Sequence, residues 1–336
     1  MTQIYISTHP FASYDPAPLN LLQNPNWHIT QNPFERKLKP EELLEFAKDA
    51  EVLIASTENL QPFIESNPKL QMIARVGIGL DSVPLRLCQE KGIRVTYTPD
   101  AVTKAVAELT IAFMISLTRN THRSDNDIRH QRWKRYVGKR LGDSTIGILG
   151  FGRVGSNVAR LLSAFSPKKI LYNDIQDKQA LAEAMQRQTG IPIHSSSKEE
   201  IFSCCDIISL HLPHTQQTDK LINKNTLALF SPHAVLINTA RGNIIDEAAL
   251  LQSLQQKRFL GAALDVFVEE PYRGRLSSLD NVLLTAHIGS CSFDCRYQME
   301  YQAAEDVVNF LSGKPLLREV PEIEYFYQDS TPNSNR

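Results

Sequence analysis

A glycine-rich turn between a strand pattern and a helix pattern constrains the fold of this chain more than any other feature. The turn, Gly150-Phe151-Gly152-Arg153-Val154-Gly155, follows the apolar run 145–149, and Asp174 ends the next apolar run. In a dinucleotide-binding unit the first glycine permits a tight turn, the second lets the backbone approach a pyrophosphate, and the third lets helix and strand pack closely. The turn therefore predicts a bound nucleotide whose phosphates lie at the helix start, near Arg153 and Val154.

Asp174 indicates which nucleotide to expect. At the end of the second strand a carboxylate can accept hydrogen bonds from both hydroxyls of an adenosine ribose, and it repels a 2′-phosphate. No arginine follows Asp174 closely. The sequence therefore favours NAD over NADP.

The rest of the chain alternates short apolar runs with longer amphipathic ones, which is typical of α/β domains. A first series has an expected strand at the N-terminus, three more at 51–55, 70–74 and 93–96, and helices at 40–50 and 82–91. The segment His9 to Pro33 is rich in proline and asparagine and is expected to be a loop. A second series has six expected strands, at 145–150, 169–174, 206–210, 234–238, 261–265 and 281–284.

Two long helix patterns mark where one series gives way to the other. Residues 103–118 form a mostly apolar helix pattern, followed by a charged stretch at 119–142, and residues 293–311 form a second one. We expect the second helix to return the chain to the first domain, and we expect the polar tail 328–336 to be frayed. The predicted architecture is two doubly wound domains: a discontinuous one, 1–104 and 291–336, and an inserted one, 105–290.

Composition excludes several classes of function. The chain has 336 residues, 42% hydrophobic and 22% charged, with a formal net charge of -1 and a pI near 6.8. These values give no basic surface for nucleic acid or an anionic membrane, and no apolar run reaches the roughly 18 residues of a membrane span. The N-terminus lacks the pattern of a signal peptide, and the five cysteines show neither metal-ligand spacing nor an even disulfide set. We therefore expect a cytoplasmic protein without a structural metal.

Three charged residues stand at the ends of successive predicted strands, where an open α/β sheet binds its ligands. They are Arg241 in Asn238-Thr239-Ala240-Arg241-Gly242, Glu270 before Pro271, and His287 in Thr285-Ala286-His287-Ile288-Gly289. A guanidinium can hold a carboxylate, a histidine can move a proton near neutral pH, and a carboxylate can orient that histidine. Each residue alone also fits a purely structural role, so the argument depends on their occurring together.

Taken together, five stretches resemble the D-isomer-specific 2-hydroxyacid dehydrogenase family. They are residues 150–155, 238–242, 246–250, 265–271 and 287–290. The stretches 75–83 and 98–103 are similar to the phosphoglycerate dehydrogenase-like branch, and the resemblance extends from about 70 to 315. It implies a flavodoxin-like substrate domain built from both chain ends, an inserted Rossmann NAD domain, an active site in the cleft and a homodimer.

The resemblance also implies a reaction and a set of roles. A hydride moves between the nicotinamide and C2 of a small D-2-hydroxy acid or 2-oxo acid. Arg241 is expected to hold the substrate carboxylate and polarise its carbonyl, while His287 moves the proton and Glu270 orients His287. The remaining cofactor contacts are expected at the adenine side and around the nicotinamide carboxamide, from Leu212, Pro213, Thr239, Ala240 and Asp265.

The first domain is expected to supply further substrate contacts. The amides that follow the strand 70–74, at Val76 and Gly77, are candidates for binding the substrate carboxylate, and Arg75 for binding a second anionic group. Phosphoglycerate dehydrogenases often place an arginine where this chain has Ser56-Thr57-Glu58-Asn59, which weakens the case for a phosphorylated substrate. The candidate substrates are 3-phosphoglycerate and the pair glyoxylate and hydroxypyruvate.

Two alternatives on the same fold remain open. One is an NAD(H)-sensing, corepressor-like binding protein, and the other is a phosphite dehydrogenase. Formate enzymes of the superfamily use a glutamine at the position of Glu270, so the carboxylate argues against them. Trp133 is expected at a dimer contact or a domain junction.

Overall fold

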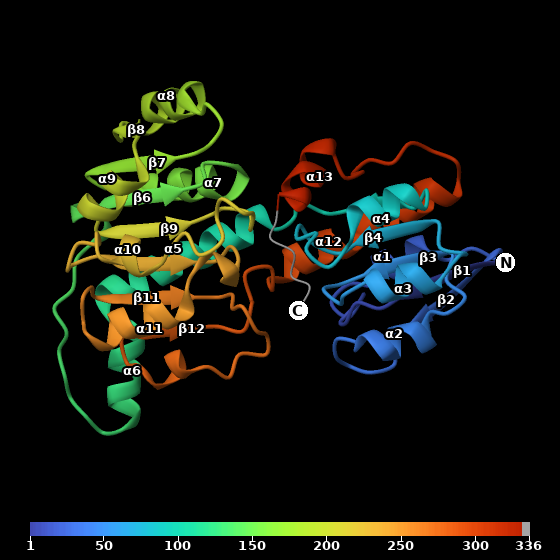
Figure 1. The fold of residues 1–336 in the computed structure, drawn as a ribbon, viewed down its shortest axis with the longest axis horizontal. Helices are drawn as coiled ribbons and strands as arrows, with labels where there is room; N and C mark the ends of the chain where they lie inside the picture. The colour runs from blue at the N-terminus through green and yellow to red at the C-terminus, as the bar shows by residue number, and fades with distance from the viewer. Residues whose placement is uncertain (331–336) are drawn as a thin grey trace. The chain divides into compact units, whose positions relative to one another are not determined.

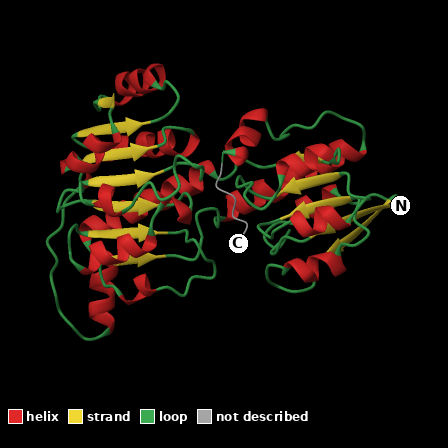
Figure 2. Cartoon of the chain, viewed as in Figure 1, coloured by secondary structure: helices red, strands yellow, loops and turns green. Residues whose placement is uncertain are grey.

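The computed structural model describes residues 1–330, and these form two compact units (Figures 1 and 2). The first unit comprises Met1–Val102 and Ser290–Ser330, and the second contains Thr103–Gly289. The chain therefore changes unit at 102/103 and 289/290, where the sequence placed the changes at 104/105 and 290/291. The last part of the predicted tail, 331–336, lies outside the described residues.

The first unit contains a parallel sheet in the order β2-β1-β3-β4-β5. Its strands are β1 (Thr2–Ile6), β2 (Trp27–Gln31), β3 (Val52–Ala55), β4 (Met72–Arg75) and β5 (Arg94–Thr96). This is the flavodoxin-like order, in which the direction of winding reverses between β1 and β3. The carboxyl ends of these two strands are therefore the expected ligand edge of the sheet.

Helices pack on both faces of this sheet. Buried side chains of α2 (Pro40–Phe46), α3 (Gln61–Ser66) and α4 (Leu85–Glu90) share one apolar cluster with β3, β4 and β5. On the other face, α12 (Phe293–Leu311) packs against β3 and β4, and α1 (Ala17–Leu21) packs against α12. The long helix 293–311 was predicted with these bounds, and it belongs to the first unit.

The segment His9 to Pro33 is more structured than the sequence indicated. The prediction of a loop there is wrong, since the segment contains α1 and β2. β2 pairs only with β1, at the edge of the sheet, and its residues are half-buried or exposed. An edge strand of this kind lacks the apolar run by which buried strands are recognised in a sequence.

The second unit contains a parallel sheet in the order β12-β11-β10-β9-β6-β7-β8. Its strands are β6 (Thr145–Leu149), β7 (Lys169–Asn173), β8 (Ile193–Ser195), β9 (Ile207–Leu210), β10 (Val235–Asn238), β11 (Gly261–Leu264) and β12 (Val282–Leu284). Six of them correspond to the six expected strands, and β8 is an additional short edge strand. The winding reverses between β6 and β9, as in a Rossmann fold, so dinucleotides are expected at the carboxyl ends of these two strands.

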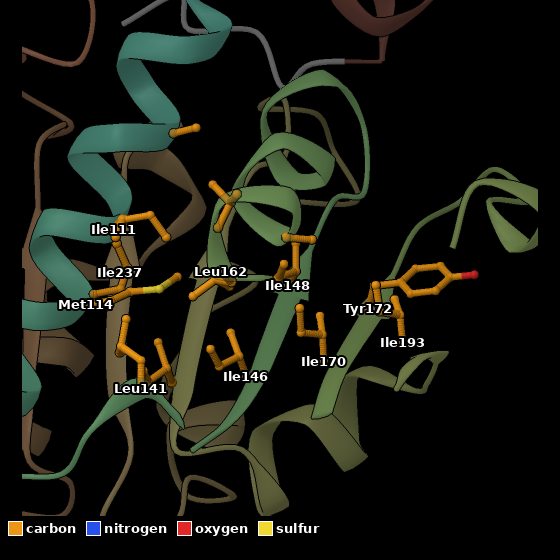
Figure 3. Packing of buried hydrophobic residues seen from close by; sticks show 14 of the residues in the cluster. Ile111, Met114, Leu141, Ile146, Ile148, Leu162, Ile170, Tyr172, Ile193 and Ile237 are labelled. Carbon is orange, nitrogen blue, oxygen red and sulfur yellow. The ribbon is translucent and has the colours of Figure 1, made fainter. Parts of the chain in front are cut away.

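Two apolar layers hold the second sheet between its helices. Buried residues of α5 (Thr103–Arg119), α7 (Arg153–Leu162) and α8 (Gln179–Thr189) form one layer with the strands. Figure 3 shows Ile111 and Met114 of α5 and Leu162 of α7 directed toward side chains of the sheet, such as Ile146 and Ile237. The opposite layer is formed by α9 (Lys198–Cys204), α10 (Lys224–Leu227) and α11 (Glu247–Gln255). The sheet is thus covered on both faces, as expected for parallel strands.

Much of the chain between α5 and β6 is exposed to solvent. A helix, α6 (Thr121–Arg129), occupies part of the charged stretch that the sequence analysis left without structure. It is followed by a segment in which Trp133 is 80% exposed and Val137 is 98% exposed. Short 3₁₀ helices lie at Leu141–Asp143, Ser163–Phe165, Gly242–Ile244 and Arg275–Ser278.

The last described segment returns to the first sheet. Val320 donates to the Val95 carbonyl at 3.0 Å, and Tyr97 donates to the Arg318 carbonyl at 3.1 Å, so residues 318–320 lie beside β5. The chain then forms α13 (Glu322–Asp329), which packs against α4. The expectation of a frayed tail from Gln328 onward is therefore wrong for Gln328 and Asp329, which belong to this helix.

No helix within residues 1–330 is both long enough and apolar enough to cross a bilayer.

Candidate active site

The glycine turn after β6 has the geometry that a bound pyrophosphate needs. Gly150 has a φ of +90°, and a Cβ there would lie 2.3 Å from the His211 carbonyl oxygen. A Cβ on Gly155 would lie 2.0 Å from the Gly150 carbonyl oxygen, whereas a Cβ on Gly152 would meet nothing within 4 Å. Gly150 and Gly155 are thus required by the turn and by packing, and Gly152 borders open space. That space fits a phosphate approaching the N-terminus of α7, where Arg153 and Val154 begin the helix.

Asp174 lies beside this turn, at the end of β7. One carboxylate oxygen accepts a hydrogen bond from the Phe151 amide at 2.7 Å, and the other accepts one from the Gln176 amide at 2.9 Å. The carboxylate is therefore fixed against the glycine turn and is only half-buried. This is the location where it could accept hydrogen bonds from ribose hydroxyls.

The loop after β9 lies next to the glycine turn, where the winding of the second sheet reverses. It contains Leu212 and Pro213, and a Leu212 methyl carbon would lie 3.1 Å from a Cβ on Gly150. The Pro213 carbonyl accepts a hydrogen bond from the Thr218 hydroxyl at 2.6 Å, which restrains the loop. Burial lowers the pKa of His211 to about 3, so its ring is neutral near pH 7 and pairs with the Ser209 hydroxyl at 2.8 Å. A proton-transfer role does not suit this histidine.

The loop that carries Arg241 is fixed by the buried Asn238 at the end of β10. The Asn238 side chain accepts a hydrogen bond from the Ala240 amide at 3.0 Å and donates one to the Arg241 carbonyl at 2.9 Å. The Thr239 hydroxyl lies 3.0 Å from the hydroxyl of the buried Thr110 of α5. The Arg241 guanidinium itself donates to the Ala240 carbonyl at 2.7 Å. The predicted cofactor and substrate residues of this motif therefore share one ordered turn.

Gly242 brings the loop after β10 against the loop after β11. A Cβ on Gly242 would lie 2.0 Å from the carbonyl carbon of Phe267. No larger residue fits at this distance, so the glycine of the motif is explained by packing. The contact joins the segment that carries Arg241 to the one that carries Glu270.

Glu270 and His287 form a direct hydrogen bond. The distance from His287 Nδ1 to one Glu270 carboxylate oxygen is 2.9 Å, and the other oxygen accepts a hydrogen bond from the Phe267 amide at 3.0 Å. The His287 side chain is 46% exposed and the Glu270 side chain is 37% exposed. A carboxylate bound to Nδ1 fixes the ring and keeps the proton on that nitrogen, so Nε2 is the atom that can exchange a proton with a ligand.

Aromatic packing restrains the loop of Glu270. Phe267 and Tyr272 stack with their ring centroids 4.1 Å apart, and the Tyr272 hydroxyl donates to a Glu247 carboxylate oxygen at 2.6 Å. Burial, together with this hydrogen bond, raises the pKa of Tyr272 to about 12. The hydroxyl therefore stays protonated and keeps the loop fixed to the start of α11.

Asp265 restrains the loop of His287. Its backbone carbonyl accepts the His287 amide at 2.9 Å, and its carboxylate accepts the Ile288 and Gly289 amides, each at 2.8 Å. The Thr285 hydroxyl also donates to this carboxylate, which is only 1% exposed. In this structure Asp265 therefore orders the histidine loop, and its predicted contact with the nicotinamide carboxamide stays a prediction.

The second unit thus places the predicted residues at one edge of its sheet. The strands β6, β7 and β9 to β12 are parallel, so their carboxyl ends face the same way. The glycine turn, Asp174, Arg241, Glu270 and His287 follow these ends. The arrangement can bind a dinucleotide and present a histidine supported by a carboxylate, together with a guanidinium. Within the described residues, no cluster of three or more His, Cys, Asp or Glu side chains could hold a metal ion.

The predicted substrate-binding groups of the first unit have hydrogen-bond partners within that unit. Arg75, at the end of β4, is 6% exposed, and its guanidinium donates to the Gly79 carbonyl at 3.0 Å and to the Val76 carbonyl. The Val76 amide donates to the Ala55 carbonyl at 2.9 Å, and the Gly77 amide donates to the Thr98 hydroxyl at 2.8 Å. The Arg75 guanidinium thus forms hydrogen bonds within its own loop, and its predicted contact with a second anionic group stays a prediction. The two amides that were assigned to a substrate carboxylate also have partners within the unit.

Several residues that shape the site escaped the sequence analysis. Thr110, Tyr272 and Thr285 act through contacts with residues distant in the chain, which have no sequence signal. Asn238 did have a sequence signal, since an asparagine before a turn often bonds to the backbone two residues later.

Comparison with known proteins agrees with this geometry. A model of the D-isomer specific 2-hydroxyacid dehydrogenase, NAD binding domain, matches residues 111–289. A glyoxylate reductase from Pyrococcus furiosus is 35% identical over 292 residues, which cover 83% of this chain and 85% of the relative. Human D-3-phosphoglycerate dehydrogenase is 34% identical over 309 residues, which cover 90% of this chain but 56% of the relative. The chain thus spans about half the length of that second protein.

A solved structure shows the same fold. The D-lactate dehydrogenase from Aquifex aeolicus, determined with NAD and lactic acid, has a TM-score of 0.80 and 26% identity, and the match covers 93% of this chain and 96% of that one. The predicted family and the predicted cofactor, NAD, are confirmed by these matches. The chain therefore belongs to the D-isomer-specific 2-hydroxyacid dehydrogenase family, and its second unit contains the family's NAD-binding domain.

Proposed function

We propose that this protein reduces a small, unphosphorylated 2-oxo acid to the D-2-hydroxy acid with NADH, and catalyses the reverse reaction with NAD. The observation that carries the proposal is the 2.9 Å hydrogen bond between Glu270 and His287 at the same sheet edge as the glycine turn. A cofactor site alone would serve a sensor equally well. A histidine restrained by a carboxylate is the additional part that proton transfer needs.

The cofactor supplies the hydride, and the residues of the chain supply the remaining steps. In reduction, His287 in its charged form donates the proton on Nε2 to the oxygen that develops at C2. Glu270 accepts the hydrogen bond from Nδ1, which fixes the ring and leaves Nε2 as the nitrogen that exchanges the proton. In the reverse direction the neutral ring accepts the proton from the hydroxyl. Histidine and carboxylate thus act as one proton-transferring pair.

Arg241 is proposed to bind the substrate carboxylate. A guanidinium is planar, stays charged and offers parallel donors that match the two oxygens of a carboxylate. The turn that Asn238 holds sets the backbone of Arg241 before substrate binds. The positive charge also favours polarisation of the neighbouring carbonyl during hydride transfer.

In the first unit we propose that the loop 76–80 helps to bind the substrate, with Arg75 as its internal support. Because the guanidinium of Arg75 donates to the carbonyls of Val76 and Gly79, it closes the loop around itself. Arg75 then determines the shape of the loop instead of contacting a distal anion. Under this proposal Arg75 is no longer a candidate for binding the phosphate of a phosphorylated substrate.

Glu58 supports the preference for an unphosphorylated acid. It lies after β3 at the ligand edge of the first sheet, is 1% exposed, and accepts hydrogen bonds from the Ser7 hydroxyl and the Ser56 amide. Glu58 therefore occupies this edge in place of a cation that could bind a phosphate. Glyoxylate and hydroxypyruvate are therefore favoured over the oxidised form of 3-phosphoglycerate.

We further propose a cytoplasmic homodimer. The segment between α6 and β6 exposes the apolar side chains of Trp133 and Val137, and we propose that a second subunit covers them. Light scattering after gel filtration should give twice the chain mass, and a Trp133→Ser, Val137→Ser variant should elute as a monomer. A monomeric wild-type protein would exclude the dimer.

The test of the reaction is NADH consumption, followed by absorbance, with glyoxylate, pyruvate, hydroxypyruvate, phosphohydroxypyruvate and 2-oxoglutarate. Turnover with glyoxylate or hydroxypyruvate that exceeds turnover with the phosphorylated acid supports the proposal. Preference for the phosphorylated acid would show that the argument from Glu58 is wrong. If the protein binds NADH and reduces none of these acids, the sensor or the phosphite enzyme takes the place of this proposal.

A further inference from the structure

The side chain of Gln328, near the C-terminus, bonds to three backbone groups of a single turn far away in the sequence. Its amide nitrogen donates to the carbonyls of Leu80 and Val83, at 3.0 and 2.8 Å. Its amide oxygen accepts the Leu85 amide at 2.7 Å. A carboxamide offers two donor hydrogens and an acceptor oxygen, and all of these functions are used here.

The turn at Leu80 to Leu85 needs such a partner because of its own sequence. The helix α4 begins at Leu85, and the residue before it is Pro84, which makes no side-chain cap. The first amides of a helix have no partner inside the helix, and proline has no side-chain oxygen to accept from them. Gln328 therefore caps α4 from another part of the chain.

Other contacts place Gln328 in this position. Asp329 forms an ion pair with Arg86 of α4 at 2.7 Å, and the Arg86 guanidinium lies 5.3 Å from the centroid of the Tyr325 ring. Before the helix, the strand-like segment at Val320 pairs with β5. Thus α13 is held on α4 by contacts separate from those of Gln328.

The turn that Gln328 holds is the continuation of the proposed substrate loop. Leu80 follows Gly79, whose carbonyl accepts a hydrogen bond from Arg75 at 3.0 Å. Upstream the loop is fixed to the sheet, through the Val76 amide and the Ala55 carbonyl and through the Gly77 amide and the Thr98 hydroxyl. Downstream, the carbonyl of Leu80 accepts from Val83 and from Gln328. Gln328 therefore restrains the downstream end of a loop whose upstream end is part of the sheet.

We propose that Gln328 is a positioning residue for the 2-oxo acid, acting through the loop 76–80. The inference rests on the proposed function, since it takes that loop as the substrate contact of the first unit. Gln328 does not touch the substrate. It keeps the loop in one conformation, so that substrate binding does not have to order the loop first.

The decisive variant is Gln328→Leu, which keeps the approximate size of the side chain and removes all three hydrogen bonds. Its KM for the preferred 2-oxo acid should rise on the order of tenfold while kcat stays within about twofold, as expected when a binding interaction away from the chemistry is lost. The Kd for NADH should not change, because the cofactor residues lie in the second unit. Asp329→Asn is the matched control: it removes the neighbouring ion pair with Arg86 and should leave KM unchanged.

A purely structural role makes a different prediction. If Gln328→Leu lowers the melting temperature and leaves KM unchanged, or if Asp329→Asn raises KM equally, the positioning role is wrong. Should Gln328→Leu fail to fold, Gln328→Glu replaces it, since a carboxylate can still accept from the Leu85 amide but cannot donate to Leu80 and Val83. An unchanged KM in that variant also overturns the proposal.

Hydrogen exchange separates this inference from the proposed function. In Gln328→Leu, peptides covering residues 76–88 should exchange faster than in the wild type and in Asp329→Asn, with NADH bound in all three. Faster exchange in a protein that reduces no 2-oxo acid would leave the loop restraint intact and refute the proposed function. Unchanged exchange would refute the restraint even in an active enzyme.

Discussion

Asp265 fixes the backbone at His287 through both its carbonyl and its side-chain carboxylate. Its carbonyl accepts the amide of His287 itself, and its buried carboxylate accepts the next two amides, of Ile288 and Gly289. The histidine therefore has two supports: Asp265 fixes its backbone, and Glu270 fixes its ring. Position and orientation are determined by different residues, so they can be disturbed separately.

Asp265→Asn tests the backbone support. An amide side chain has only one oxygen, so it cannot accept all the donors that now share the carboxylate, and its NH2 group would face an N–H. Turnover should fall by about 10² because the imidazole moves relative to the reacting oxygen. The melting temperature should fall as well. A variant with wild-type turnover would show that the loop keeps its shape without Asp265.

His287→Ala tests the proton transfer. Turnover should drop by a factor on the order of 10² or more, since a positioned acid or base typically contributes that much. NADH binding, measured by fluorescence titration, should stay nearly unchanged, because the glycine turn and Asp174 are unaffected. Unchanged turnover would remove His287 from the mechanism.

Asp174→Ala tests the choice of nucleotide. The variant loses the carboxylate that is fixed by the Phe151 and Gln176 amides, and with it the proposed ribose contacts and the repulsion of a 2′-phosphate. The Kd for NADH should rise, and the ratio of kcat/KM for NADH to that for NADPH should fall. If this ratio is the same as in the wild type, the discrimination lies in other residues.

Gly242→Ala and Gly152→Ala form a matched pair with opposite expectations. A methyl group on Gly242 meets the Phe267 backbone at 2.0 Å, so the variant should be less stable by about 1–3 kcal/mol or more and should turn over more slowly. A methyl group on Gly152 meets nothing within 4 Å, so the melting temperature should hold while NADH binding weakens. Thermal denaturation and NADH titration of both variants distinguish the two roles. Equal loss of stability in both would contradict the assignment of open space at Gly152 to a phosphate.

The location of the candidate site residues in the second unit could be predicted from the sequence. The glycine turn, Asp174, Arg241, Glu270 and His287 each follow a buried parallel strand, and such strands are continuous apolar runs that are easily recognised. Since parallel strands end at one edge, their order along the chain already indicates that these residues lie near one another. Six of the seven strands in the second unit were predicted for this reason.

The elements that were missed are those with little apolar surface. β2 and β8 are short edge strands with few buried residues, and Asp127 is the buried residue of α6. Contacts between distant residues were missed for a different reason. Gln328 was read as part of a polar tail, because nothing in its neighbourhood indicates the turn 243 residues away that it caps. The hydrogen bonds of Arg75 to its own loop likewise have no signal in the sequence.

His287 has a φ of +53°, in the left-handed region that residues with a Cβ adopt only at a cost. Glycine, and to a lesser degree asparagine, would occupy this position with less strain. The hydrogen bonds from the His287, Ile288 and Gly289 amides to Asp265 hold the histidine in this conformation, so the backbone strain of the loop depends on that one aspartate.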